Sequence, residues 1–531
     1  MAMFVNRIPE LTTIEEHFNM FFNQKERLAG YTPILDFYGV KGIGKTSLLH
    51  KFSQKLVETN TRYIEAEFHR DASVLARRLQ AQAQKYMPVA SAENETQDAY
   101  TQSIHQLQKL LDQGPLVLLL DAIDTNDQQQ IDALEKMLRE LVGYQTLFVL
   151  LTSRHQLHFE NERKVRDKLK TYNVEPFSQE HSYIYLKQLD TSLTVEQCQI
   201  IFDWTRGYPL AMNKLVEIMH TGLDITDKEG QKHIAQQIAD QILMQEQLAT
   251  IPPAEQEWYQ NILYLLTIPR SFNLIILQQL IEHFKPEYKL ANSLAYLVLP
   301  RKIIQATGII TWKMALAGFA MDEPVRYILQ LNLKINQPQR YKELHAFLAQ
   351  YNWQNAIETT NHERTRYLRE YLYHSACSSE PRQLADLLTR TGRNIIEHTQ
   401  EHPDQLIRLL EEFLQDQELQ YILAPHGAIL TNLIYEHLTE KMYQFYLEEP
   451  QTEQRFDLLN SFFFYTAKNK SIAKKADALL PRLQEILERE DPGRMLHLYE
   501  RLGRDAVFKE GMGQDFDVLY AIIRQKTNPE G

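Results

Sequence analysis

An eight-residue loop, residues 39–46, constrains the fold of this chain more than any other feature. It reads Gly-Val-Lys-Gly-Ile-Gly-Lys-Thr, follows the apolar run 34–38 and precedes a helical pattern. This is the G-x-x-x-x-G-K-[ST] pattern in its expected setting between a strand and a helix. Its glycines let backbone N–H groups turn toward phosphate oxygens, and the helix N-terminus behind them attracts anions. The sequence therefore predicts a phosphate-binding loop for a nucleoside triphosphate.

Each residue of this loop has an expected role. Lys45 would reach the β- and γ-phosphates, and the hydroxyl of Thr46 would bind Mg²⁺. The other predicted nucleotide contacts from this loop and the start of its helix are Gly39, Lys41, Gly42, Ile43, Gly44 and Ser47.

Composition narrows the class of protein. A chain of 531 residues predicts about three to four domains. The net charge of −12 argues against non-specific nucleic-acid binding, which usually needs a basic face. The two cysteines lie far apart and form no zinc pattern. No apolar run approaches the ~18 residues of a membrane span, and no N-terminal signal segment is visible, so we expect a cytoplasmic protein.

The first third of the chain alternates strand and helix patterns. The expected strands are 33–38, 63–68, 116–121, 146–152 and 172–176. Such alternation predicts an α/β fold with a five-stranded parallel sheet, covered by helices on both faces. Thr13 and Glu16 form a capping-box pattern that would start a helix before the first strand. We expect this nucleotide-binding domain to span residues 1–178.

Helical patterns dominate the rest of the chain. We expect a small helical lid domain at 179–250, broken by Gly-Tyr-Pro at 207–209 and bounded by the proline pair at 252–253. Helices followed by a β-rich stretch around 303–314 predict a winged-helix domain at 251–335. Residues 336–531 show apolar positions at helical spacing, for example 406, 409, 410, 413 and 414, and predict an all-α domain. Within it, the aromatic run 462–465 favours a buried helix.

Two strand ends add chemistry to the phosphate loop. Asp121 ends the apolar run 116–120, and Arg154 follows the run 149–151. Ligands of parallel α/β sheets lie at the carboxyl ends of the strands, so both side chains would face the phosphates. There, Asp121 would hold Mg²⁺, and Arg154 would bind the γ-phosphate by charge-assisted hydrogen bonds.

With these motifs in place, the chain resembles the STAND-class signal-transduction ATPases, an AAA+-related group that includes the NACHT and NB-ARC families. Residues 4–11 resemble the family's F-V-x-R-x-x-E-L box, which implies that the backbone at Val5 and the side chain of Arg7 lie against adenine and ribose. Residues 207–211 are similar to the G-x-P-L-A box, whose proline, here Pro209, packs on the nucleotide. Segments 121–124, 152–154, 322–326 and 338–345 resemble further family motifs.

The chain departs from the family pattern at two positions. Ala122 stands where a catalytic Glu commonly follows the strand-end Asp, which leaves Asp124 as the nearest carboxylate that would orient water. We therefore expect slow hydrolysis or nearly none. Asp322 aligns with the histidine of the methionine-histidine-aspartate motif, and an Asp facing phosphate would repel it. Either the alignment slips at this point or the resting state is held differently.

The resemblance implies an ATP/ADP-binding switch that requires Mg²⁺, changes conformation on activation and assembles into homo-oligomers. The C-terminal helical region would then dock a protein partner, and no effector domain would precede the ATPase box. One alternative is an AAA+ ATPase that loads or binds DNA through its winged helix. The other is a nucleotide-bound scaffold without turnover.

Overall fold

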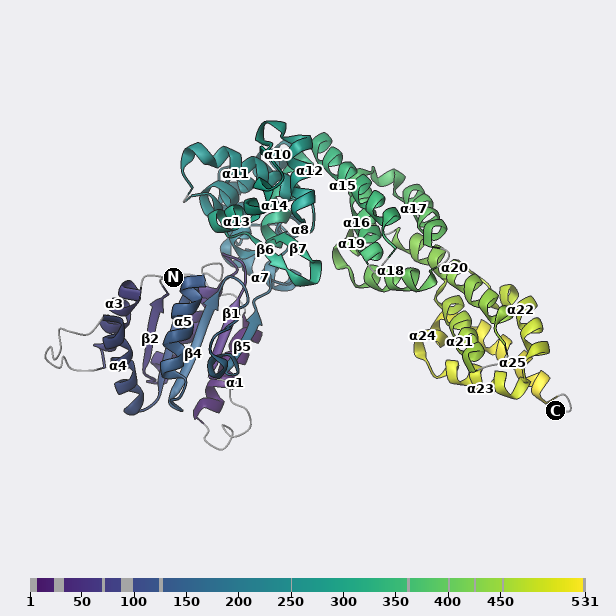
Figure 1. The fold of residues 1–531 in the computed structure, drawn as a ribbon, viewed down its shortest axis with the longest axis horizontal. Helices are drawn as coiled ribbons and strands as arrows, with labels where there is room; N and C mark the ends of the chain where they lie inside the picture. The colour runs from purple at the N-terminus through teal and green to yellow at the C-terminus, as the bar shows by residue number, and fades with distance from the viewer. Residues whose placement is uncertain are drawn as a thin grey trace. The chain divides into compact units, whose positions relative to one another are not determined.

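The computed structural model describes residues 7–22, 33–68, 72–86, 99–123, 128–249, 251–360, 363–399, 402–424, 426–450 and 453–528. It divides into two compact units, Met1–Gln337 and Pro338–Gly531 (Figure 1). Across the described residues, no helix is both long enough and apolar enough to cross a membrane.

A parallel five-stranded sheet forms the centre of the first unit. Its strands are β1 (Ile34–Tyr38), β2 (Tyr63–Glu67), β3 (Leu116–Ile123), β4 (Leu147–Ser153) and β5 (Leu169–Asn173), in the order β2-β3-β4-β1-β5. All four neighbouring pairs are parallel. The predicted α/β class is confirmed, although β5 (Leu169–Asn173) begins and ends three residues before the predicted strand at 172–176. The phosphate loop follows β1, which lies between β4 and β5 in the sheet. It therefore leaves the sheet at the carboxyl ends of the strands, where parallel α/β sheets bind their ligands.

Helices cover both faces of this sheet. They are α1 (Ile8–Phe22), α2 (Lys45–Glu58), α3 (Ala72–Ala83), α4 (Ala99–Asp112), α5 (Gln128–Leu141) and the short α6 (Arg163–Arg166). On one face, Phe18 of α1 and Phe52 of α2 pack edge-on with ring centroids 5.3 Å apart, and both lie near Phe148 of β4. On the other face, apolar residues of α3, α4 and α5 share one core with Leu118 and Leu120.

The start of α1 corrects the capping-box expectation. The helix already begins at Ile8, so Thr13 lies inside it rather than at its N-terminus. The Thr13 hydroxyl instead donates to the carbonyl of Pro9, four residues back, at 2.9 Å. A threonine inside a helix can satisfy its hydroxyl in this way, and the sequence pattern alone does not separate the two uses.

Helices follow the sheet to form the rest of the first unit. They are α7 (Gln179–Leu189), α8 (Val195–Thr205), α9 (Pro209–Met219), α10 (Lys228–Asp240), the π-helix η2 (Gln241–Gln247), α11 (Pro253–Leu266), α12 (Leu274–Phe284), α13 (Ala295–Thr307) and α14 (Glu323–Asn336). Between α13 and α14, β6 (Ile310–Lys313) and β7 (Gly318–Met321) form an antiparallel hairpin. Three helices and a hairpin are the order expected of a winged helix, and that assignment, like the domain boundaries inside this unit, stays a prediction.

The second unit is helical throughout its described residues. Its helices are α15 (Pro338–Glu358), α16 (Glu363–Ser378), α17 (Leu384–Thr399), α18 (Pro403–Gln415), α19 (Gln417–Leu423), α20 (Gly427–Glu448), α21 (Glu453–Lys468), α22 (Lys475–Arg489), α23 (Pro492–Gly503), α24 (Ala506–Met512) and α25 (Asp515–Thr527). The predicted all-α C-terminal region is confirmed. Phe462 and Phe463 of α21 are fully buried in an apolar core, as the aromatic run 462–465 favoured.

Candidate nucleotide-binding site

The phosphate loop runs from the end of β1 into α2, as its sequence predicts. Gly42 and Gly44 adopt left-handed backbone angles, with φ of +79° and +107°, which residues with a Cβ rarely adopt. A Cβ added to Gly42 would also lie 2.6 Å from the Cβ of Leu210 in α9. The glycine therefore permits both the turn and the close approach of α9. The first N–H groups of α2 then point out of the loop, where helix geometry leaves them available to an anion.

Lys45 lies at the first position of α2 and lines the cavity above the loop. Its ammonium donates to the carbonyls of Gly39 at 2.6 Å and Val40 at 3.0 Å. Burial, and next the nearby charge of Arg154, lower the pKa of Lys45 to about 8. A phosphate beside the ammonium would favour its charged form and raise the pKa of Lys45 again.

Asp121 lies where β3 reaches the cavity, beside Thr152 of β4. The Thr152 hydroxyl donates to the carboxylate of Asp121, and the N–H of Ala122 donates to the same oxygen at 2.9 Å. Ala122 has a φ of +63°, at a register shift between Leu120 and Ile123. This local irregularity follows directly on Asp121, whose carboxylate lines the cavity together with Thr46.

These two residues fit a magnesium ion bound with a nucleotide. Among the described side chains, no three His, Cys, Asp or Glu residues gather into a metal site of their own. Mg²⁺ in nucleotide sites takes only one or two protein ligands and completes its shell with phosphate oxygens and water. Thr46 and Asp121 supply that minimal set. The predicted water-orienting Asp124 lies outside the described residues.

Arg154 extends from the end of β4 toward residues that lie beyond the sheet domain. Its guanidinium is 3.5 Å from the carboxylate of Asp322, which precedes α14, and it donates to the side-chain oxygen of Gln247 at 3.3 Å. Gly308 approaches so closely that a Cβ there would lie 2.6 Å from Arg154 Nη1. Asp322 therefore faces an arginine, and this contact links the strand end to the region after β7.

Burial shapes the charges around this contact. It raises the pKa of Asp322 to about 6, against the opposing effects of Arg154, Lys313 and Lys45. The neighbouring His155 is also largely buried, and burial together with the charge of Arg154 lowers its pKa to about 3. His155 is therefore neutral at physiological pH, while Asp322 and Arg154 form an ion pair above about pH 6.

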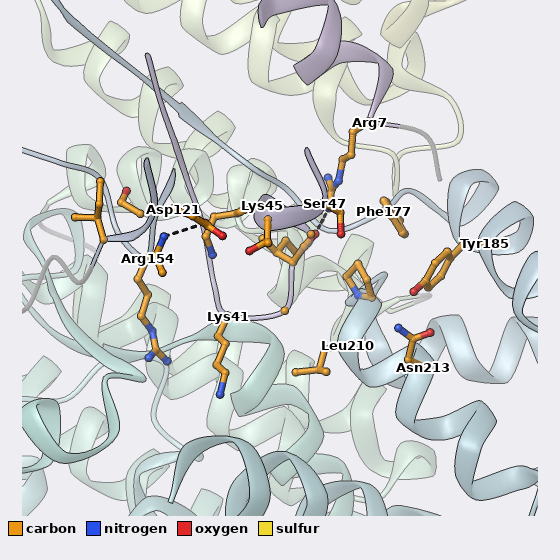
Figure 2. A pocket seen from close by; sticks show the side chains of 18 residues that line it. Arg7, Lys41, Lys45, Ser47, Asp121, Arg154, Phe177, Tyr185, Leu210 and Asn213 are labelled. Atoms are coloured by element: carbon orange, nitrogen blue, oxygen red, sulfur yellow. Dashed lines mark hydrogen bonds between the residues drawn. The ribbon is translucent and has the colours of Figure 1, made fainter. Parts of the chain in front are cut away.

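The opposite end of the cavity is aromatic. We call it the base end and define it by Arg7, Phe177, Tyr185, Pro209 and Asn213. Figure 2 shows Phe177, Tyr185 and Asn213 on one side of the loop, with Asp121 and Arg154 on the other. The rings of Phe177 and Tyr185 pack edge-on at 5.3 Å, and the Arg7 guanidinium lies 4.5 Å from the Phe177 ring centroid. Flat apolar walls with one amide suit a nucleobase.

Arg7 also ties the start of the described chain to the loop. It donates to the carbonyl of Ile43 at 2.6 Å and forms an ion pair with Glu10 at 3.0 Å. Gly207, with a φ of +80°, lies so close to Phe177 that a Cβ would be 2.0 Å from its carbonyl oxygen. This contact sets the position of α9, and therefore of Pro209, against the base end.

Together these residues enclose a cavity of about 570 Å³, a volume typical of small-molecule sites. The sequence-predicted residues that line it are Arg7, Lys41, Gly42, Ile43, Gly44, Lys45, Thr46, Ser47, Asp121, Arg154 and Pro209. Gly39 is not among the lining residues but shapes the loop behind them, where its carbonyl accepts from Lys45. The predicted contact at Val5 lies outside the described residues.

Seven lining residues were not predicted as site residues: Ala122, Ile123, Ser153, Phe177, Tyr185, Leu210 and Asn213. The first three lie near Asp121 or Arg154 in the predicted motif segments 121–124 and 152–154. Leu210 lies inside the G-x-P-L-A box at 207–211, and Asn213 follows Pro209 by about one turn of α9, so extending the box by one turn would have found Asn213. Phe177 and Tyr185 carry no motif in sequence. Only the packing of the segment after β5 and of α7 places their rings at the loop.

Comparison with known proteins agrees with this site. Residues 35–190 match the model of the NACHT domain family. No curated protein sequence matches the chain.

The solved structures to which the chain is similar include the following three. A STAND protein with a tetratricopeptide repeat sensor from Pyrococcus horikoshii is 14% identical, with coverage of 100% of this chain and 78% of that chain and a TM-score of 0.31. The ORC2 protein of Aeropyrum pernix is 13% identical, with 64% and 97% covered and a TM-score of 0.39. AMPPCP-bound DnaA from Aquifex aeolicus is 16% identical, with 57% and 90% covered and a TM-score of 0.31.

Likenesses at this level say nothing about what the present chain binds. The family match carries more weight, because it covers the phosphate loop, Asp121 and Arg154 in one segment. Residues 35–190 therefore match the NACHT domain family, on an α/β fold with a phosphate-binding loop.

Proposed function

We propose that this protein is an ATP-dependent switch in which the terminal phosphate competes with Asp322 for Arg154. The observation that carries the proposal is the 3.5 Å contact between these two side chains. Arg154 lies at the end of a sheet strand, and Asp322 lies beyond the β6–β7 hairpin. A ligand that binds Arg154 more tightly than Asp322 does would favour the state in which the two segments separate.

The cavity supports adenine nucleotides in one orientation. The base end would hold the base between Phe177, Tyr185 and Pro209, and the loop N–H groups would hold the β-phosphate. Lys45 would then turn from the loop carbonyls to the phosphates, and Thr46 and Asp121 would hold Mg²⁺, which neutralises phosphate charge when bound. A triphosphate would offer its γ-phosphate oxygens to Arg154, and a diphosphate would not. Hydrogen bonds between charged groups are stronger than those between neutral groups.

Assembly and partner binding complete the proposal. Separation at Asp322 would expose surface of the first unit, and contact with further copies would give the homo-oligomer that the family resemblance implies. The helical second unit, with its two apolar cores, would dock a protein partner. Neither step needs fast hydrolysis, since differential affinity for the two nucleotides is sufficient to shift the equilibrium.

Calorimetry tests nucleotide binding and the state of Lys45 together. A phosphate beside the ammonium raises the pKa of Lys45 above its value of about 8 in the structure. Binding at pH 8 should therefore take up roughly half a proton, and affinity should fall as the pH rises through 8. Titration of MgATP in two buffers of different ionisation enthalpy measures this uptake, which should nearly vanish at pH 6.5. Absence of binding heat for both MgATP and MgADP at every pH would contradict the proposal.

A further inference from the structure

The segment η2, residues Gln241–Gln247, is a π-helix rather than an α-helix. The chain passes into it directly from α10, and the N–H of Leu248 donates to the carbonyl of Leu243, five residues back, at 2.9 Å. Such i→i+5 turns are rare; most are single-turn bulges inside α-helices, and they are frequent at functional sites. Their presence here calls for a reason in the contacts that the segment makes.

Two neighbouring residues of η2, Glu246 and Gln247, contact two cations that line the cavity, Lys41 and Arg154. The Glu246 carboxylate lies 3.0 Å from the ammonium of Lys41, which also donates to the Glu246 carbonyl at 2.9 Å. The side-chain oxygen of Gln247 accepts from Arg154 at 3.3 Å. Lys41 and Arg154 both line the cavity, so one turn of chain engages a cation of the loop and a cation of the strand end.

The contact between Gln247 and Arg154 is buried rather than at the surface. The residue is only 5% exposed. Its Nε2 has no hydrogen-bond partner within the part of the chain that the structure describes, and neither does Nε of Arg154. A buried donor without an acceptor costs free energy, and a phosphate oxygen beside Arg154 would satisfy its Nε.

The π-turn is what allows both contacts at once. A change from i→i+5 to i→i+4 bonding shifts the following residues by one position, which is about 100° on a helix of 3.6 residues per turn. Glu246 and Gln247 would then leave Lys41 and Arg154 together. The segment is therefore a single element that either holds both cations or releases both.

We propose that η2 determines the specificity of the site, and that by holding Lys41 and Arg154 it sets the preference for diphosphate over triphosphate. The inference deepens the ATP-binding proposal and depends on it. Glu246 and Gln247 act as positioning residues, because they work through Lys41 and Arg154 rather than on the nucleotide.

Substitution of Glu246 by Gln tests this role. The variant keeps the side-chain shape, removes the charge that pairs with Lys41, and should raise the ratio Kd(ADP)/Kd(AMPPNP) by about twofold to fivefold, since the pair is partly exposed. Substitution Gln247→Met should raise the same ratio by about twofold to tenfold. Calorimetry with Mg²⁺ measures both constants. Glu229→Gln is the matched control, because it breaks an exposed pair with Lys232 on α10 and should leave the ratio unchanged.

A double-mutant cycle separates the proposed route from a direct charge effect. In a Lys41→Met background, Glu246→Gln should no longer change the ratio, because its partner is gone. A ratio that moves equally in both backgrounds would overturn the inference, as would unchanged ratios in both single variants whose melting temperatures match the wild type. Failure of the ATP-binding proposal is distinguishable, because the wild-type protein would then bind neither nucleotide.

Discussion

Substitution of Lys45 by Met is expected to weaken binding of both MgATP and MgADP by about 10- to 150-fold, because the variant loses the charge-assisted hydrogen bonds from Lys45 to phosphate. In the structure the ammonium is half-buried and donates to the carbonyls of Gly39 and Val40. Methionine preserves the length and apolar contacts of the side chain but offers no donor. The fold should survive, since a lysine lost from a partly dry loop also removes a desolvation cost.

Calorimetry measures this loss, and Lys109→Met is its control. Lys109 is an exposed lysine in the last turn of α4, in the same domain, and it does not line the cavity. Its substitution should leave both affinities within experimental error. If Lys45→Met binds nucleotide as tightly as the control variant, the phosphate loop does not hold the phosphates.

Substitution of Asp322 by Asn is expected to shift the protein toward the triphosphate form. The Asn side chain keeps its size but lacks the charge that pairs with Arg154, so a γ-phosphate no longer competes with a carboxylate. A coupling of the usual allosteric size would raise Kd(ADP)/Kd(AMPPNP) by about 5- to 150-fold. Mass photometry should then show assembly of the variant at lower nucleotide concentration than the wild type needs.

The pH dependence provides an internal check on Asp322→Asn. Since the pKa of Asp322 is raised to about 6, its carboxylate is charged above that pH and protonates below it. The wild-type ratio should therefore move toward that of the variant as the pH falls from 7 to 5.5. A constant difference between the two proteins across this range would show that the charge of Asp322 is not what opposes the triphosphate.

The positions of the motif residues were predictable because each motif lies within one short segment of the sequence. Gly42, Gly44 and Lys45 fall in one short loop, and Asp121 and Arg154 each end an apolar strand, so the parallel sheet brings them together. The family boxes added Arg7 and Pro209. The loop and strand-end residues needed only the order of elements, whereas Arg7 and Pro209 came from the family resemblance.

The rest of the site depends on contacts between distant segments. Phe177 and Tyr185 reach the cavity only because α7 and α9 pack beside the loop, with Gly207 against Phe177. The family alignment placed Asp322 at a phosphate-contacting histidine and left open a slipped alignment or a differently held resting state; in the structure Asp322 faces Arg154. No sequence pattern marks the π-turn that carries Glu246 and Gln247, since hydrogen bonds rather than residue types define it.

Hydrogen–deuterium exchange of the wild-type protein, compared between ADP and AMPPNP with Mg²⁺, tests the switch most directly. If the terminal phosphate displaces Asp322 from Arg154, peptides that cover β6, β7 and the N–H of Asp322, which donates to the carbonyl of Ile309, should exchange faster with AMPPNP than with ADP. The phosphate loop itself should be protected equally by both nucleotides. Equal exchange of the β6–β7 segment in the two saturated complexes would contradict the proposed competition for Arg154.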